Sequence, residues 1–166
     1  MAVNQNQGSK SFLQLIEILR DSCLDNKLIN TVSQGDISEV DLDKQSIFPL
    51  AHIIVNNAQF SSTIITYNVT ILFMDMVTEG KESGVEITEA EIYANDNENW
   101  VFNSMLNSGN HVTDIFNSGS KNDGNTRIVR ESVQAEPFKD RFENLLAGWS
   151  FTFNVETRNN IDRCNT

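Results

Sequence analysis

The segment WSFTFNVE, Trp149 to Glu156, alternates large apolar and polar residues without a break. Successive side chains of a β-strand point to opposite faces, so this alternation predicts a strand with one apolar and one polar face. The apolar face is expected to hold Trp149, Phe151, Phe153 and Val155. The polar face is expected to hold Ser150, Thr152, Asn154 and Glu156.

Two earlier segments predict strands that pair with each other. STIITYNVTILFMDMV, Ser62 to Val77, is the strongest strand signal in the chain, because apolar residues alternate with Asn and Thr from Ile65 to Phe73. IFPLAHIIVNNAQF, Ile47 to Phe60, is apolar and β-branched, and its Pro49 belongs at a strand start or edge. The two strands can pair as a hairpin through Asn57 to Ser62.

An amphipathic helix is predicted near the N-terminus, capped by Ser11 and ending near Asp25-Asn26. Its apolar stripe at helical spacing consists of Phe12, Leu15, Ile16, Leu19 and Cys23. A stripe about one face wide is expected for a helix that lies on a sheet.

A second helix is predicted from about residue 98, with Asp96 or Asn97 as its cap and Glu98 in its first turn. Its apolar residues recur at multiples of three to four: Val101, Met105, Val112 and Phe116. Gly109 lies in the middle and is expected to weaken the helix by about 1 kcal/mol relative to alanine.

The remaining segments complete the order of elements. We predict a first strand at Leu28–Ser33, a loop or edge at Asp36–Lys44, a short strand or continued loop at Glu86–Tyr93, a loop at Asn117–Asn125, and a strand at Thr126–Ala135 followed by a turn carrying Pro137. Helices that do not alternate strictly with strands favour an α+β fold, here a mainly antiparallel β-sheet packed against two helices. We expect a flexible N-terminus over residues 1–9, a single α+β domain over residues 10–160 and a polar C-terminal tail over residues 161–166.

The charge balance is strongly acidic, with 23 Asp and Glu against 12 Lys and Arg and a net charge of −11. A protein that grips nucleic acid by neutralising phosphates needs a basic surface, so stable binding of DNA or RNA is not expected. The acidic surface fits simple solubility, and it also fits DNA that passes nearby without adhering, because like charges repel.

Residues that could carry chemistry are few. His52 falls within a predicted strand, where a hydrogen-bonded structural role is expected, and His111 is expected at the surface. Neither has a partner at metal-ligand spacing, and no nucleophile elbow, phosphate-binding glycine loop or calcium-loop pattern occurs. We therefore predict no catalytic residue, no cofactor-binding residue and no metal ligand.

The two cysteines and the apolar runs indicate the compartment. Cys23 lies on a helix stripe and is expected to be a buried free thiol, whereas Cys164 lies in the polar tail. Two cysteines do not make a disulfide framework, so a reducing compartment is the simpler inference. No signal peptide and no membrane span is predicted.

Aromatic and charged residues gather before the last strand, at Phe138, Arg141, Phe142 and Trp149. One interpretation is a turn that buries its aromatic rings while the charges stay in water. The other makes these residues anchors against a neighbouring subunit, because aromatic residues and arginine are enriched in interface cores.

The closing motif AEPFKDRFENLLAGWSFTFNVETRN, Ala135 to Asn159, together with the order of elements, resembles the small tail terminator and tail-completion (neck) proteins of long-tailed bacteriophages. The segment Leu145 to Trp149 leading into a final alternating strand is most similar, especially to versions carried by phages of Bacteroidetes-type hosts. The motif covers the last quarter of the chain, and the remainder agrees in order and length only.

The resemblance implies a sheet backed by helices and a homo-oligomeric ring, usually a hexamer, at the head-proximal end of the tail tube. Such a ring stops tube polymerisation and joins the tube to the head connector. The implied partners are further copies of the chain, the tail tube protein, the head-completion or connector protein, and genomic DNA that passes through the lumen without specific binding. The implied location is the tail or neck of the virion, assembled in the host cytoplasm, with no membrane partner and no catalytic residues.

Alternative functions stay open from the sequence. The chain could be another neck or tail component, such as a head-completion stopper or a tube protein. It could also be a non-viral, monomeric protein-binding module. An enzyme that uses scattered carboxylates is a third class of function.

Overall fold

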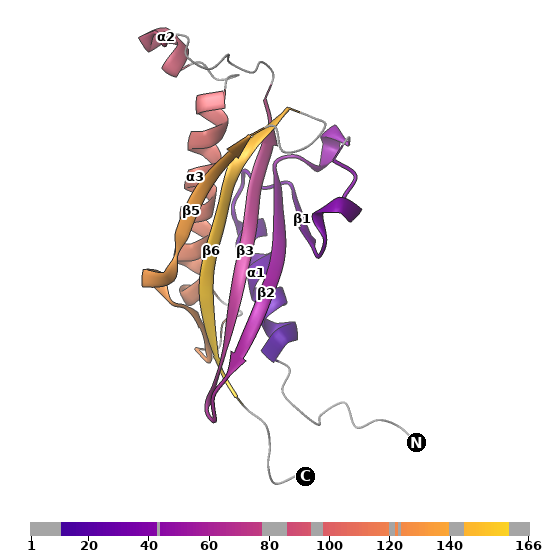
Figure 1. Ribbon diagram of the computed structural model, residues 1–166, viewed down its shortest axis with the longest axis vertical. Coiled ribbons are helices and arrows are strands. Elements are labelled where there is room, and N and C mark those ends of the chain that lie inside the picture. Colours follow the sequence, from indigo (N-terminus) through magenta and orange to yellow (C-terminus); the bar gives the residue numbers. More distant parts are fainter. Residues whose placement is uncertain are drawn as a thin grey trace.

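A computed structural model describes residues 11–42, 44–77, 86–93, 98–119, 122, 124–139 and 145–159. A curled, mostly antiparallel six-stranded sheet packs one face against two helices, α1 (Ser11–Asp25) and α3 (Glu98–Ile115) (Figure 1). The strand order is β1-β2-β3-β6-β4, and β5 lies beside β6 on the same side as β4. The predicted α+β class with its mainly antiparallel sheet is therefore confirmed.

The centre of the sheet is the antiparallel pair β3 (Ile64–Met76) and β6 (Leu146–Arg158). Both were predicted from their alternating residues. β2 (Leu50–Phe60) pairs with the other side of β3, as the predicted hairpin requires. The connection is shorter than predicted, because the pairing continues to Phe60 and leaves only residues 61–63 between the strands.

The helix face of the sheet carries the main core. All four apolar residues predicted for the second helix are buried: Val101, Met105, Val112 and Phe116. The stripe of α1 lies slightly rotated from its prediction, since Ile18 and Ser22 are buried, whereas Phe12 is 41% exposed and Ile16 only half-buried. Ser11 is the first residue of α1, and its hydroxyl hydrogen-bonds with that of Tyr67 on β3 at 2.7 Å.

Gly109 is the point of closest approach between α3 and the sheet. A Cβ built on Gly109 would lie 2.2 Å from the ring of Phe151, which in turn meets Phe73 edge-to-face at 5.4 Å between ring centroids. The expectation that Gly109 is a weak point was therefore incomplete. Glycine lowers the helix propensity of α3 at this position, but only glycine allows the Phe151 ring to lie against the backbone of α3.

A second, smaller apolar cluster covers one end of the opposite sheet face. Residues 36–42 and 44–48, which contain two short 3-10 turns, Ile37–Glu39 and Gln45–Ile47, fold over this end. The cluster beneath them consists of Phe48, Leu50, Leu72, Met74, Phe138 and Leu146. The predicted loop at Asp36–Lys44 is thus a cover for the sheet.

The first strand and the segment before the second helix differ from their predictions. β1 is Thr31–Gln34 and runs parallel to β2. Before β1, the Asn26 side chain accepts the amide of Leu28 where the chain leaves α1. Glu86–Tyr93 forms neither a strand nor a plain loop. It contains a short helix, α2 (Glu89–Ile92), whose first turn is closed by a reciprocal capping box between Thr88 and Glu91.

The predicted strand Thr126–Ala135 is interrupted. It consists of β4 (Thr126–Ile128), a 3-10 turn at Arg130–Ser132, and the start of β5 (Gln134–Lys139). Pro137 does not lie in a turn, since it pairs with Trp149 within β5. An edge strand tolerates proline because one side of its backbone has no neighbouring strand to receive an N–H.

We expect Gly109→Ala to lower the free energy of unfolding by about 1–3 kcal/mol, because overpacking must displace the Phe151 ring. Helix propensity alone favours the opposite sign. Urea denaturation of the wild type, Gly109→Ala and the exposed control Asn110→Ala measures the difference. A Gly109→Ala variant as stable as the control would contradict the close packing of α3 on Phe151.

Candidate functional site

The residues predicted as interface anchors lie inside the fold or outside the described residues. Phe138 is only 6% exposed, because its ring packs in the smaller cluster. Trp149 is half-buried, donates from Nε1 to the carbonyl of Phe102 at 2.8 Å, and meets the Phe102 ring edge-to-face. Arg141 and Phe142 lie outside the described residues. Phe138 and Trp149 thus serve packing within the chain and leave little area for another subunit.

His52 is buried and fully hydrogen-bonded. Its Nε2 lies 2.7 Å from the Gly35 carbonyl, which can only accept, so Nε2 carries the proton. Its Nδ1 then accepts from the Ser33 hydroxyl at 2.6 Å. Burial lowers the pKa of His52, against the opposing effects of the Gly35 carbonyl and the Asp36 charge. This geometry ties β1 to β2 in the way expected of a structural histidine.

The other reactive side chains do not converge. His111 is exposed and lies 3.4 Å from a carboxylate oxygen of Asp25. Burial raises the pKa of the Cys23 thiol to about 12, so the thiolate, the reactive form, is strongly disfavoured. Within the described ranges, no three His, Cys, Asp or Glu side chains stand close enough to hold a metal ion. In the same ranges no helix is both long and apolar enough to cross a membrane.

Two hollows, of about 440 and about 510 Å³, lie between α1 and α3. Asp25 borders both of them. Their walls mix carboxylates, amides and hydroxyls with few apolar side chains. They offer no arrangement that points to a particular ligand.

The sheet face opposite the helices is a polar surface over the half not covered by residues 36–42 and 44–48. Asn68 donates to Asn154 at 3.0 Å, Asn56 donates to Asn68 and Thr70, and Thr70 shares a hydrogen bond with Thr152. These amides and hydroxyls satisfy one another across three strands. The face is therefore uncharged at its centre and internally bonded.

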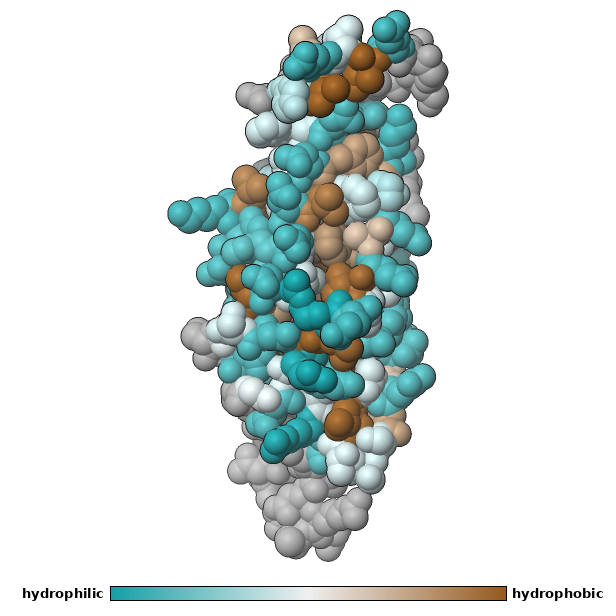
Figure 2. Space-filling view, turned by 90° about the vertical axis from the view of Figure 1, so that its left-hand side faces the viewer, coloured by the Kyte–Doolittle hydropathy of each residue, from teal (hydrophilic) through white to brown (hydrophobic). Residues whose placement is uncertain are grey.

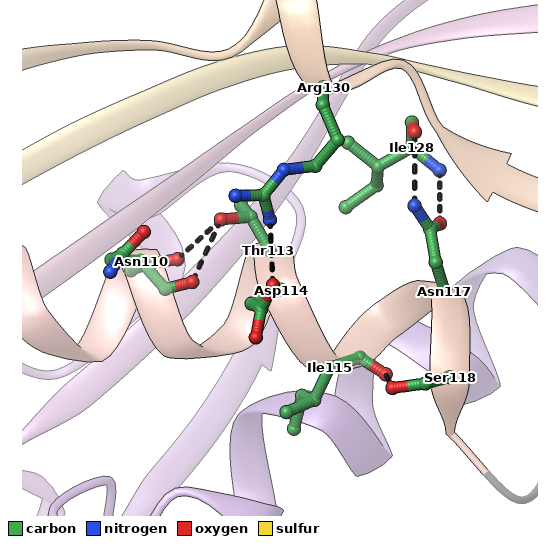
Figure 3. A network of polar contacts seen from close by, with 9 residues as sticks. Asn110, Thr113, Asp114, Ile115, Asn117, Ser118, Ile128 and Arg130 are labelled. Atoms are coloured by element: carbon green, nitrogen blue, oxygen red, sulfur yellow. Dashed lines mark hydrogen bonds and ion pairs between the residues drawn. The ribbon is translucent and has the colours of Figure 1, made fainter.

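The edges of the sheet differ in how open they are. At the β4 edge, the Asn117 side chain accepts from the Ile128 amide at 2.8 Å and donates to the Ile128 carbonyl at 3.3 Å, so it takes the place of a further strand (Figure 3). Arg130 also reaches back to Asp114 on α3 (Figure 3). Part of the loop predicted at Asn117–Asn125 thus stabilises the fold itself.

The opposite edge is open along half of its length. β1 pairs with β2 only as far as Ile53, so in the described part of the chain no strand lies beside β2 from Ile54 to Phe60. A register shift between Val55 and Asn57 marks a β-bulge, a feature that limits edge-to-edge pairing.

Exposed apolar side chains lie at both ends of the molecule, and others lie on the two helices, at Phe12, Leu13, Leu24 and Leu106. Figure 2 shows hydrophobic residues at the α2 end, set among hydrophilic ones. The exposed residues there are Ile87, Ile92, Tyr93 and Trp100. At the other end, the β2–β3 turn exposes Phe60 and Ile64. Sequence reasoning missed both groups, although the apolar residues set among glutamates at 86–93 were a signal.

Comparison with known proteins adds no relative from which function could be carried over. The chain matches no protein-family model, and a search of curated proteins finds no match. The class that the fold and its surfaces define is an α+β sheet scaffold backed by two helices.

We expect the stability of the wild type to fall as the pH drops from about 7 to about 5, partly because the unfolded state takes up a proton on His52 more readily than the folded state does. The lowered folded pKa means that this stability is complete above the ordinary pKa of histidine. It is lost as the pH falls through the folded value.

His52→Gln should remove this component and cost about 1–3 kcal/mol near pH 7, because Ser33 and Gly35 lose a well-placed partner. Urea denaturation at several pH values measures both effects, with the exposed His111→Gln as the control. Equal pH dependence in His52→Gln and the wild type would contradict the neutral, buried imidazole.

Proposed function

We propose that this chain is a non-enzymatic structural subunit of a phage tail or neck, a ring-forming tail terminator. In this role, copies of the chain form a ring, of six subunits in the simplest case, that caps the tail tube. The ring joins the tube to the head-completion or connector protein. Its place is the virion, after assembly in the host cytoplasm.

The observation that carries the proposal is the closing motif, Ala135 to Asn159. The segment Leu145–Trp149 leads into β6, and Gly148 pairs with Met74 of β3. A Cβ on Gly148 would lie 1.9 Å from the Phe73 carbonyl oxygen, so the glycine of this motif is required by packing. The likeness to tail terminators thus falls on a central strand of the sheet.

The surfaces support an assembly role. A ring needs a heterologous contact, in which one patch meets a different patch on the next copy. Exposed apolar residues lie at both ends of the molecule and also on the two helices, at Phe12, Leu13, Leu24 and Leu106, and neither hollow between the helices points to a particular ligand. Exposed apolar side chains at separate positions on the surface can form the two different patches that such an interface needs.

The charge distribution supports passage of DNA without binding. The net charge is −11, and Arg127 and Arg130 each lie within 3.4 Å of a carboxylate, Glu156 and Asp114 respectively. Basic side chains that are already paired attract phosphate weakly. A lumen lined by such a surface would repel DNA and let it slide.

We expect the purified chain to form closed rings of uniform subunit number at high protein concentration. Size-exclusion chromatography with light scattering gives the subunit number, and electron microscopy of the same fraction tests for a central hole. Adding double-stranded DNA at low salt should leave the elution unchanged.

Two results would count against the proposal. A monomer at the highest attainable concentration would favour the alternative of a monomeric binding module. A salt-sensitive shift of the protein on adding DNA would contradict a lumen that repels nucleic acid.

A further inference from the structure

One end of the molecule, here called the acidic end, is the segment Glu86–Tyr93. Every residue of this segment is exposed, and Tyr93 is 74% exposed. The segment contains three glutamates, three large apolar or aromatic residues and no basic residue. Its helix α2 has only four residues, far fewer than an isolated helix needs for stability in water. Its capping box satisfies the first turn, and its apolar side chains Ile87 and Ile92 are 46% and 42% exposed.

The opposite end of the long axis, here called the basic end, consists of Phe60, Ile64, Arg127 and Arg158 (Figure 1). Ile64, Arg127 and Arg158 line a hollow of about 150 Å³. Phe60, at the β2–β3 turn, is 72% exposed, and its side chain is on the helix face of the sheet because it pairs with the buried Ile65, whereas Ile64 is on the open face. Arg127 is paired with Glu156 at 3.3 Å, and Arg158 has no ion-pair partner in the described part of the chain.

The two ends are complementary. The acidic end offers projecting apolar side chains flanked by glutamates. The basic end offers a small hollow in which two arginines, Arg127 and Arg158, stand against one carboxylate, Glu156, with Ile64 as an apolar wall. In a chain of net charge −11, two exposed arginines beside exposed apolar groups make a local exception to the general repulsion between copies.

We propose that the acidic end of one copy docks on the basic end of the next. In this contact Ile92 and Tyr93 lie across the end of the sheet, against Ile64 on its open face and Phe60 on its helix face. The glutamates face Arg158, since Arg127 is already paired with Glu156. Exposed ion pairs add little stability, so the apolar side chains supply most of the affinity and the charges set orientation and partner choice.

Because each copy carries one end of each kind, the contact is heterologous and repeats from copy to copy. It closes into a ring if the rotation between copies closes, and it gives an open chain if the rotation does not. The inference rests on the proposed function, since it names the residues that join neighbouring subunits of the ring.

The test uses two variants of the full chain, each with one end blocked. Ile92→Asp with Tyr93→Asp blocks the acidic end, and Arg127→Glu with Arg158→Glu blocks the basic end. By sedimentation velocity, each variant alone should associate at least tenfold more weakly than the wild type. An equimolar mixture should form a one-to-one dimer and nothing larger, because each dimer has one intact contact and two blocked ends.

A matched control carries the same kinds of change on the exposed face of α1, Leu13→Asp with Arg20→Glu, and should associate like the wild type. Circular dichroism checks folding. If the double arginine variant is unfolded, Phe60→Asp replaces it, because the Phe60 side chain lies at the turn and is 72% exposed, so its replacement should perturb the fold little. The contact is refuted if the wild type stays monomeric, if either blocked variant associates normally, or if the mixture stays monomeric.

The outcomes separate this contact from the proposed function. Closed rings that persist in both blocked variants refute the contact and leave the ring function standing. Open chains of wild type that both variants disrupt support the contact and refute the ring.

Discussion

β3 and β6 pair antiparallel over all thirteen residues of each strand, and the other elements are placed by reference to this pair. β2 extends the sheet from β3, while β4 and β5 share the outer side of β6. A slip of one residue would move every apolar side chain to the opposite face. The register therefore decides that Phe73 and Phe151 meet beneath the helices and that Asn68 and Asn154 meet on the open face.

This constraint explains which parts of the fold could be predicted from the sequence. The alternation at 65–73 and 149–156 and the helical spacing of Val101, Met105, Val112 and Phe116 are local patterns that report burial directly. The interruption of Thr126–Ala135 is not local, because it depends on how two short strands share one side of β6. The role of Gly109 is likewise set by Phe151, a residue far along the chain that presses on the helix.

The candidate site was harder to predict than the fold, for a related reason. An aromatic residue such as Phe138 can be buried in a core or in an interface. Only the tertiary structure shows that Phe138 is buried in the smaller apolar cluster. The apolar residues of Glu86–Tyr93 are interspersed with glutamates, so their pattern alone did not separate a loop from the short exposed helix that forms there. The phage-tail proposal continues to rest on the closing motif, and the structure adds a rigid frame with distinct ends.

The central claim is that the β3–β6 sheet is a rigid scaffold and that its two ends make the contacts with other copies. Hydrogen exchange followed by mass spectrometry, on dilute and on concentrated protein, tests both halves of this claim. We expect the slowest amides to lie in β3 and β6 at both concentrations, with added protection at high concentration confined to the segments around Glu86–Tyr93 and the β2–β3 turn. Slowest exchange in α3, or added protection spread over the open sheet face, would contradict it.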